Sequence, residues 1–500
     1  MELSIPHRTQ IHDLVRVARQ GTKVAISQAN KNNIQASRKI VEQIIRSKQV
    51  QYGVTTGFGA FKNTVINSHQ TKTLQKNLIL SHSVGVGKPL PPDVVRGIMF
   101  IMIRYLSQGH SGVRLETFHT LVEMLNNGVT PIVPEKGSVG SSGDLAPSAH
   151  IALVLIGAGE ALYKGHVYPG AKAMKLAGIT PITLEAKEGL AIINNTSAMT
   201  SISSLLLYDA EWLMSVAAVS AALSLQALMG TDRAYDPRVH ALKPHREQIR
   251  VAQLLRALLK GSTFINKERI QEAYSFRCVP QVHGAIGNML NYSKSIVTTE
   301  LNSVTDNPLI FTGDNPDVIS GGNFHGEAVA IAMDAAGIAL CELGDISERR
   351  LAALLDPATN NALPAFLIEN GGVNSGLMIT QYTAAALVSE NKVLAHPASV
   401  DSIPTSANIE DIVSMGTIAA RKAREIFENV AVVLSIELLA SCQAIDVRKK
   451  HADKKLHLSP RTDRVYTFIR KKIPYVEHDT EYRKYFMSIR NDLASIAALV

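Results

Sequence analysis

Cysteine is scarce in this 500-residue chain, which contains only Cys278, Cys341 and Cys442. These residues lie far apart in the sequence, so they predict neither a disulfide framework nor a clustered metal site. Their scarcity favours a reducing compartment, and we expect the protein to be cytoplasmic. The first ten residues, MELSIPHRTQ, are too polar for a secretory signal peptide.

Aromatic residues are also few, at 5% of the chain with Trp212 as the single tryptophan. Small aliphatic residues take their place, so that hydrophobic residues reach 46% while charged residues make up 19%. This composition excludes a largely disordered chain and favours closely packed helices over a β-sandwich. A chain of this length has room for one large domain or for two to three smaller ones.

A strong excess of charge of one sign is lacking as well. The formal net charge is +8, which is mild for 500 residues. Basic residues are densest at 448–455 and 470–472, but no aromatic stacking motif or zinc-ligand spacing accompanies them. We therefore interpret both stretches as solvated surface and expect no nucleic-acid partner.

One uncharged stretch, residues 212–231, is long enough to span a bilayer. It contains Ser215, Ser220, Ser224 and Gln226, many alanines and few aromatic residues. This composition is more typical of a helix buried in a protein core, so we expect no membrane association.

Several catalytic signatures are missing from the sequence. There is no GxxxxGK[ST] loop, no HExxH pair and no GxSxG elbow, and the GVG at 85–87 lacks the further glycine of a dinucleotide-binding loop. The sequence therefore supports neither a metal nor a nucleotide cofactor.

Three apolar stretches without proline, 201–230, 327–355 and 409–445, predict long helices, because proline breaks helices. The stretch 201–230 is apolar nearly all round, which is typical of a helix at the centre of a bundle. The first 190 residues contain more glycines and turns. We expect a mainly α protein, with an N-terminal domain at 1–190 and a long-helix bundle with a C-terminal helical region at 191–500.

The segment 137–147, GSVGSSGDLAP, is the most unusual in the chain. A cluster of glycine and serine is usually a flexible surface loop. Here an apolar run follows at once, and Pro147 is suited to the first position of a helix. We therefore expect the loop to end where a helix presents free N–H groups and the positive end of its dipole.

This segment resembles the signature of the histidine and aromatic amino-acid ammonia-lyases. In that family an Ala-Ser-Gly triad cyclises autocatalytically to 4-methylidene-imidazole-5-one (MIO), an electrophilic prosthetic group. The matching residues here are Ser141, Ser142 and Gly143. The resemblance implies that the Gly143 amide nitrogen attacks the carbonyl carbon of residue 141 and that Ser142 loses its hydroxyl. Ser141 replaces the usual alanine, but residue 141 contributes only backbone to the ring.

Further blocks resemble the same family and follow in the family's order. They are YGVTTGFG at 52–59, EGLAIIN at 188–194, QEAYSFR at 271–277, ELNSVTDNP at 300–308, SGGNFHGE at 320–327 and VDSIPTSANIED at 400–411. The methionine-proline-lysine loop of the related fumarase–aspartase proteins is absent. The resemblance implies elimination of ammonia from an L-α-amino acid.

The resemblance also implies roles for individual residues. Tyr52 is expected to remove the β-proton, with its pKa lowered by its surroundings from about 10. Tyr274 is expected to support MIO and the substrate pose. Arg277 is expected to hold the substrate carboxylate, because a guanidinium pairs with a carboxylate through two hydrogen bonds. The other residues expected to bind substrate or line the site are Asn194, Gln271 and Phe324.

Two positions bear on substrate choice. His82 follows a serine, and this pair resembles the histidine-specific branch, whereas the phenylalanine-specific branch has an apolar pair. Glu410 also resembles the histidine-specific enzymes, and we expect its carboxylate near the start of the 409–445 helix, where negative charge is favoured. The neighbouring Ile409 and Ile412 depart from the usual glutamine and histidine and make that wall more apolar.

The resemblance therefore predicts conversion of L-histidine to trans-urocanate in a homotetramer whose active sites are each built from several subunits. A tyrosine or phenylalanine ammonia-lyase and a 2,3-aminomutase remain as alternatives. A rival from another class is a catalytically silent helical scaffold with a basic nucleic-acid-binding tail. Attack on MIO by the substrate amine and attack by its aromatic ring both remain open.

Overall fold

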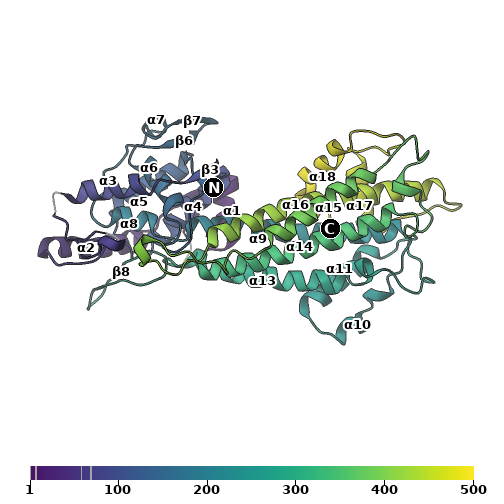
Figure 1. The fold of residues 1–500 in the computed structure, drawn as a ribbon, viewed down its shortest axis with the longest axis horizontal. Helices are drawn as coiled ribbons and strands as arrows, with labels where there is room; N and C mark the ends of the chain where they lie inside the picture. The colour runs from purple at the N-terminus through teal and green to yellow at the C-terminus, as the bar shows by residue number, and fades with distance from the viewer. Residues whose placement is uncertain (1, 6–7, 58, 68–69) are drawn as a thin grey trace. The chain divides into compact units, whose positions relative to one another are not determined.

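The computed structural model describes residues 2–5, 8–57, 59–67 and 70–500. Helices dominate this part of the chain (Figure 1), which confirms the prediction of a mainly α protein. The strands of the described residues form small sheets of two or three strands, with the orders β1-β2, β3-β5, β4-β6-β7 and β8-β9.

The chain folds into two compact units, and neither is continuous in sequence. Unit 1 comprises Met1–Tyr208, Lys294–Asp334 and Pro397–Arg421. Unit 2 comprises Asp209–Ser293, Ala335–His396 and Lys422–Val500. Each unit consists of three separate segments of the chain. The units therefore do not test the predicted domains 1–190 and 191–500, which stay a prediction.

Unit 1 contains the small sheets and most of the shorter helices. Its early helices are α1 (Ile11–Gln20), α2 (Gln28–Ser47), α3 (Thr71–His82), α4 (Pro92–Leu106), α5 (Leu115–Asn126), α6 (Leu145–Leu155), α7 (Gly170–Leu176) and α8 (Glu188–Ile193). Its strands are β1 (Glu2–Ser4), β2 (Lys23–Ala25), β3 (Val86–Pro89), β4 (Thr130–Pro131), β5 (Pro134–Lys136), β6 (Glu160–Tyr163), β7 (His166–Pro169), β8 (Leu309–Phe311) and β9 (Asp317–Ile319). The short 3-10 helices η1 (Gly59–Phe61) and η5 (Ser406–Asn408) complete it.

Two of these strand pairs, β6-β7 and β8-β9, join strands that follow closely in the sequence. β1 and β2 are parallel, with Leu3 opposite Val24. The remaining pairs are antiparallel, and β6 and β7 form a hairpin in which Tyr163 lies opposite His166. These sheets are too small to form a core of their own.

The core of unit 1 forms around α4, which is buried along nearly its whole length and packs against α1 and α5. A second apolar helix, α6, packs against α3 and α8. A Cβ on Gly97 of α4 would lie 2.2 Å from the Ser201 hydroxyl oxygen, so glycine permits a close approach there. α6 and α8 also pack against each other.

Long helices contribute residues to both units. They are α9 (Ser197–Ala227), α13 (Val279–Asn302), α14 (Glu327–Leu355) and α16 (Gly416–Lys450). The helix predicted at 327–355 has these bounds in the structure, and the one predicted at 201–230 corresponds to α9.

The helix predicted at 409–445 begins later, at Gly416. Residues 406–408 and Met415 have positive φ angles between 53° and 64°, which residues within a right-handed helix do not adopt. Glu410 therefore lies outside the first turn of α16. The prediction that the start of this helix favours its negative charge was wrong.

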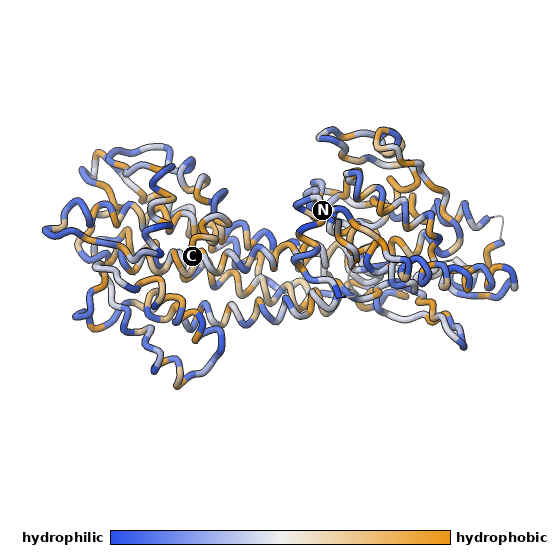
Figure 2. Tube along the Cα trace, turned by 180° about the vertical axis from the view of Figure 1, so that it is seen from behind, coloured by the Kyte–Doolittle hydropathy of each residue, from blue (hydrophilic) through white to orange (hydrophobic). Residues whose placement is uncertain are grey.

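Unit 2 contains the other helices of the described residues. They are η3 (Arg233–Tyr235), α10 (Pro237–Ala241), α11 (Arg246–Leu259), α12 (Tyr274–Arg277), η4 (Ala365–Leu367), α15 (Met378–Leu394), α17 (Pro460–Arg470) and α18 (Tyr482–Ala497). Hydrophobic and hydrophilic residues alternate along many of the helices (Figure 2), as expected for helices that bury one face.

Two helical segments, Glu188–Ala227 and Gly416–Lys450, are long and apolar enough to cross a membrane by length and composition. In their most apolar windows, 72% and 89% of the residues are buried inside the protein. Such burial is typical of core helices, in agreement with the interpretation of residues 212–231.

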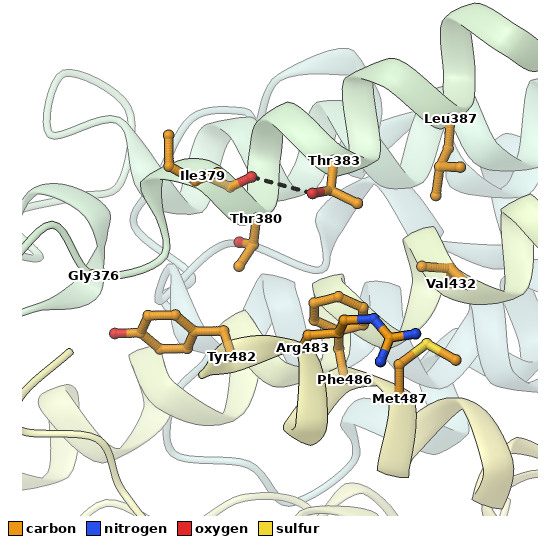
Figure 3. Close-up of a pocket in the computed structure, with 10 residues that line it drawn as sticks. All are labelled: Gly376, Ile379, Thr380, Thr383, Leu387, Val432, Tyr482, Arg483, Phe486 and Met487. Carbon is orange, nitrogen blue, oxygen red and sulfur yellow. Dashed lines mark hydrogen bonds between the residues drawn. The ribbon is translucent and has the colours of Figure 1, made fainter. Parts of the chain in front are cut away.

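A pocket of about 440 Å³ opens in unit 2 between α15 and α18. Figure 3 shows apolar side chains such as Ile379, Leu387 and Phe486 around it, together with the guanidinium of Arg483. None of the sequence-predicted site residues is among the residues that line it.

A buried ion pair joins the long helices in unit 2. The Glu437 carboxylate on α16 accepts hydrogen bonds of 2.6 and 2.8 Å from Arg350 on α14, and neither side chain is exposed. Hydroxyls of Ser347 on α14 and Ser224 on α9 donate to the same carboxylate at 2.6 and 2.7 Å. These hydrogen bonds offset the cost of burying the two charges.

We expect Glu437→Gln to lower the free energy of unfolding by about 3 kcal/mol, because it leaves the buried Arg350 charge without its anion. Circular dichroism during denaturant unfolding measures the loss as a lower midpoint. Arg250→Gln is the control, since its ion pair with Glu247 is largely exposed on the arginine side and costs less than about 1 kcal/mol. Equal midpoints for the two variants would contradict this role of Glu437.

Candidate active site

The glycine–serine loop lies between β5 and α6 in unit 1. The helix begins at Leu145, so Pro147 is its third residue rather than its first and still belongs to the first turn. Gly143 has a φ of +67°, which favours glycine. A Cβ there would also lie 2.1 Å from the carbonyl oxygen of Asn195. Only glycine fits at this position of the triad.

Asp144 fixes the loop at its C-terminal end. Its buried carboxylate accepts hydrogen bonds from the Met199 amide at 2.8 Å, the Ser138 hydroxyl at 2.9 Å and the Thr417 hydroxyl. Its own amide donates to the carbonyl of Asn195 at 2.6 Å. Burial raises the pKa of Asp144, although these hydrogen bonds act in the opposite direction. The triad is thereby tied to the beginnings of α9 and α16.

The Glu410 carboxylate reaches both serines of the triad. The Ser141 hydroxyl donates to Oε2 at 2.5 Å, and the Ser142 hydroxyl donates to Oε1 at 2.8 Å. Thr405 donates to Oε2 at 3.2 Å and also pairs with Glu410 through backbone hydrogen bonds in both directions. The structure therefore brings the predicted Glu410 into direct contact with the predicted triad.

Asn194 contacts the triad at another point. It ends α8, is 4% exposed, and donates from Nδ2 to the carbonyl oxygen of Ser142 at 2.7 Å. An amide donor at this oxygen withdraws electron density from the carbonyl of residue 142.

Tyr52 lies in the half-buried turn before η1, where its hydroxyl oxygen accepts a long hydrogen bond of 3.5 Å from the Gly59 amide. Burial raises the pKa of Tyr52, the Gly59 hydrogen bond lowers it, and the negative charge of Glu410 raises it further. The net direction is upward. It is the opposite of the lowered pKa that the sequence analysis expects, because burial outweighs the single amide.

His82 is the last residue of α3, and its Nδ1 lies 3.0 Å from the Ser81 hydroxyl oxygen. Burial lowers the pKa of His82, while the Leu78 carbonyl and the Glu410 charge raise it. The lowered pKa favours the neutral form of this imidazole. Glu410 acts electrostatically on both Tyr52 and His82, so the three predicted residues share one site.

Phe324 lies half-buried in the segment before α14. The amide of Gly326, two residues later, donates to the carbonyl of Gly140 at 3.2 Å. Phe324 is therefore joined to the glycine–serine loop through the backbone of its own segment.

The other predicted residues, Gln271, Tyr274 and Arg277, belong to unit 2 and form a group of their own. The guanidinium carbon of Arg277 lies 4.5 Å from the centre of the Tyr274 ring, and its Nη1 donates to Gln271 Oε1 at 2.5 Å. Tyr274 is 70% exposed. The structure thus divides the predicted site residues into this group and the cluster in unit 1.

The family model for aromatic amino acid lyases matches residues 9–471. The chain is 52% identical over 472 residues to histidine ammonia-lyase of Alkaliphilus oremlandii, covering 94% of this chain and 92% of that protein. It is 53% identical over 440 residues to histidine ammonia-lyase of Treponema denticola, covering 88% and 87%.

This chain belongs to the aromatic amino acid lyase family. The resemblance found in the sequence is thereby confirmed, and the protein is a carbon–nitrogen lyase.

Solved structures agree with this membership of the lyase family. The crystal structure of histidine ammonia-lyase from Trypanosoma cruzi has a TM-score of 0.92 and 41% identity, covering 100% of this chain and 94% of that one. Phenylalanine aminomutase of Pantoea agglomerans has a TM-score of 0.94 and 35% identity, covering 100% of both chains.

Sequence reasoning missed several residues of this lyase that hold the triad. Asp144 follows the triad directly, but its role depends on Thr417, which lies 273 positions further along the chain. Thr405 belongs to the block around Glu410, yet nothing in the sequence singles it out. Among the described residues, no group of three or more His, Cys, Asp or Glu side chains is arranged to hold a metal ion.

We expect ammonia release by this lyase to increase as the pH rises from about 7 to about 10, because a base must be deprotonated and the pKa of Tyr52 is raised. Glu410→Gln removes a negative charge and so lowers the pKa of Tyr52. The activity that remains in this variant should therefore begin to rise at a lower pH than in the unmodified enzyme. Initial rates across buffers of equal ionic strength measure both profiles, and Tyr52→Phe serves as the inactive control. A flat profile above pH 7 would argue against Tyr52 as the base.

Proposed function

We propose that this lyase eliminates ammonia from L-histidine to give trans-urocanate. The observation that carries the proposal is the placement of Glu410 on the triad serines, within electrostatic reach of His82. A carboxylate and a neutral imidazole suit a polar, hydrogen-bonding ring better than a phenyl ring. The histidine ammonia-lyases that resemble this chain at about half of its positions support the same substrate.

We further propose that Ser141, Ser142 and Gly143 form MIO autocatalytically. The Gly143 nitrogen bonds to the carbonyl carbon of residue 141, whose oxygen leaves as water. Ser142 loses its hydroxyl together with its α-hydrogen as a second water. The residues present fit this group, because the backbone leaves room only for glycine at position 143 and Asn194 donates to the carbonyl of residue 142.

MIO supplies an electrophilic carbon that makes the substrate amine a better leaving group. Beside this group, the phenolate oxygen of Tyr52 accepts the β-proton of the substrate, and the Gly59 amide stabilises the phenolate. Glu410 and His82 orient the imidazole ring, and Asn194 polarises the carbonyl of residue 142. Phe324 lines the same site.

Arg277 holds the substrate carboxylate in this proposal, and Tyr274 and Gln271 set its position. The guanidinium carbon lies 4.5 Å from the centre of the Tyr274 ring, and this contact helps to hold the guanidinium for a bidentate pair with the carboxylate. We propose that this exposed group completes a site together with residues of other copies in a homotetramer. Apolar side chains exposed on the long helices of unit 2, such as Met289, Tyr292 and Ile338, support assembly through these helices.

We place the enzyme in the cytoplasm, since its three cysteines are free thiols, as a reducing compartment maintains them. The substrate is a small amino acid, and the proposal involves neither nucleic acid nor membrane.

One observation favours an aromatic substrate without an imidazole. Ile409 and Ile412 flank Glu410, are 49% and 63% exposed, and offer no hydrogen bond to a polar ring. A tyrosine or phenylalanine ammonia-lyase or a 2,3-aminomutase is therefore the second candidate, and a substrate panel separates it from the first.

We expect the intact protein mass to be lower than the mass of the sequence by two waters, about 36 Da. Ser142→Ala removes the leaving hydroxyl, so it should lack this deficit and lose turnover by about a thousand-fold or more. Gly143→Ala should also lack it, because its Cβ collides with Asn195. Ser141→Ala should keep it. A full-length, folded protein without any deficit would instead indicate the silent scaffold.

We expect kcat/KM for L-histidine to exceed the values for L-tyrosine and L-phenylalanine by about a hundred-fold or more. The double variant His82→Leu, Glu410→Gln should lose histidine turnover, because the substrate imidazole then loses both the carboxylate charge of Glu410 and the ring of His82, and its residual activity should shift towards phenylalanine. Absorbance of urocanate, coumarate and cinnamate measures the three reactions. If the unmodified enzyme preferred tyrosine or phenylalanine, the assignment of histidine as substrate would be wrong, but the assignment of MIO would stand.

A further inference from the structure

The Ser141 side chain makes the shortest hydrogen bond that Glu410 accepts. The oxygen–oxygen distance of 2.5 Å is that of a charge-assisted bond between a hydroxyl and a carboxylate. Ser141 is only 4% exposed, so water competes little for this contact. An alanine, which the family usually has at this position, cannot make it.

The two oxygens of the Glu410 carboxylate have different partners. Oε2 accepts from Ser141 at 2.5 Å and from Thr405 at 3.2 Å. Oε1 accepts from Ser142 at 2.8 Å. Under the proposed function the Ser142 hydroxyl leaves as water, whereas Ser141 keeps its hydroxyl because its side chain lies outside the ring. The loss of one donor therefore affects Oε1 and leaves both donors on Oε2 in place.

The surroundings of Glu410 in this chain explain why such a contact is needed. Its backbone is paired with Thr405, and the Thr405 hydroxyl adds only a longer hydrogen bond of 3.2 Å to Oε2. The side chains of the nearby Ile409 and Ile412 carry no hydrogen-bonding group. The serine at position 141 supplies, from the triad itself, a donor that these two residues lack.

We propose that Ser141 is a positioning residue that anchors Oε2 of Glu410 and so directs Oε1 towards the imidazole N–H of the substrate. This inference rests on the proposed function. The backbone of residue 141 takes part in ring formation. Its side chain has a separate role, which is to select a substrate ring that carries a hydrogen-bond donor.

Ser141→Ala tests this task, with Ser141→Thr as the matched variant that keeps the hydroxyl. Calorimetry measures the affinity of each protein for urocanate, which carries an imidazole, and for cinnamate, which does not. We expect Ser141→Ala to bind urocanate roughly ten-fold more weakly, as for loss of a hydrogen bond to a charged group, and cinnamate within about two-fold. Ser141→Thr should restore urocanate affinity, and intact mass should show the two-water deficit in all three proteins.

Kinetics supply a second measurement. KM for L-histidine should rise in Ser141→Ala, while the rate for L-phenylalanine stays the same, because only the imidazole uses Oε1. Thr405→Val should have a smaller effect, since its bond to Oε2 is longer.

Unchanged urocanate affinity in Ser141→Ala would overturn the inference, as would equal weakening for cinnamate, which indicates a merely structural role. Loss of the mass deficit in Ser141→Ala would also overturn it, because Ser141 would then act in ring formation. The proposed function has a separate test in the unmodified protein. If that protein released no ammonia from L-histidine, the proposed function would be wrong, and the inference on Ser141 would be wrong as well.

Discussion

The buried carboxylate of Asp144 is the constraint on which the site in unit 1 depends. A buried charge is costly unless all its hydrogen bonds are made, so its donors Ser138, Met199 and Thr417 cannot move independently of it. Through them the loop between β5 and α6 is held to the beginnings of α9 and α16. The positive φ of Gly143 adds no strain to this arrangement, because glycine adopts such angles readily.

The chemistry of the site follows from this rigid loop. Glu410, Asn194, Tyr52 and His82 come from separate segments, and each contacts the triad or responds to the charge of Glu410. In the proposed reaction the raised pKa of Tyr52 determines the protonation state of the base before substrate binds. The free site holds the base protonated, because burial and a nearby carboxylate both disfavour the phenolate.

Two departures from the family pattern are related in this chain. Isoleucines at 409 and 412 offer no polar side chain next to Glu410 in the sequence, and the serine at 141 donates a hydrogen bond to its carboxylate. The carboxylate thus keeps a short hydrogen bond in a more apolar setting. Because all three positions lie around the same carboxylate, the proposed preference for imidazole depends on the set rather than on any one of them.

The sequence by itself determined the helical class, the bounds of α14 and the family, because proline placement, apolar patterning and contiguous motifs are local properties. Only the tertiary structure decided that α16 begins at Gly416, that the pKa of Tyr52 is raised and that Ser141 holds Glu410. These features depend on backbone angles, burial and contacts between residues hundreds of positions apart. Such properties arise only when distant segments pack together, so no local pattern in the chain records them.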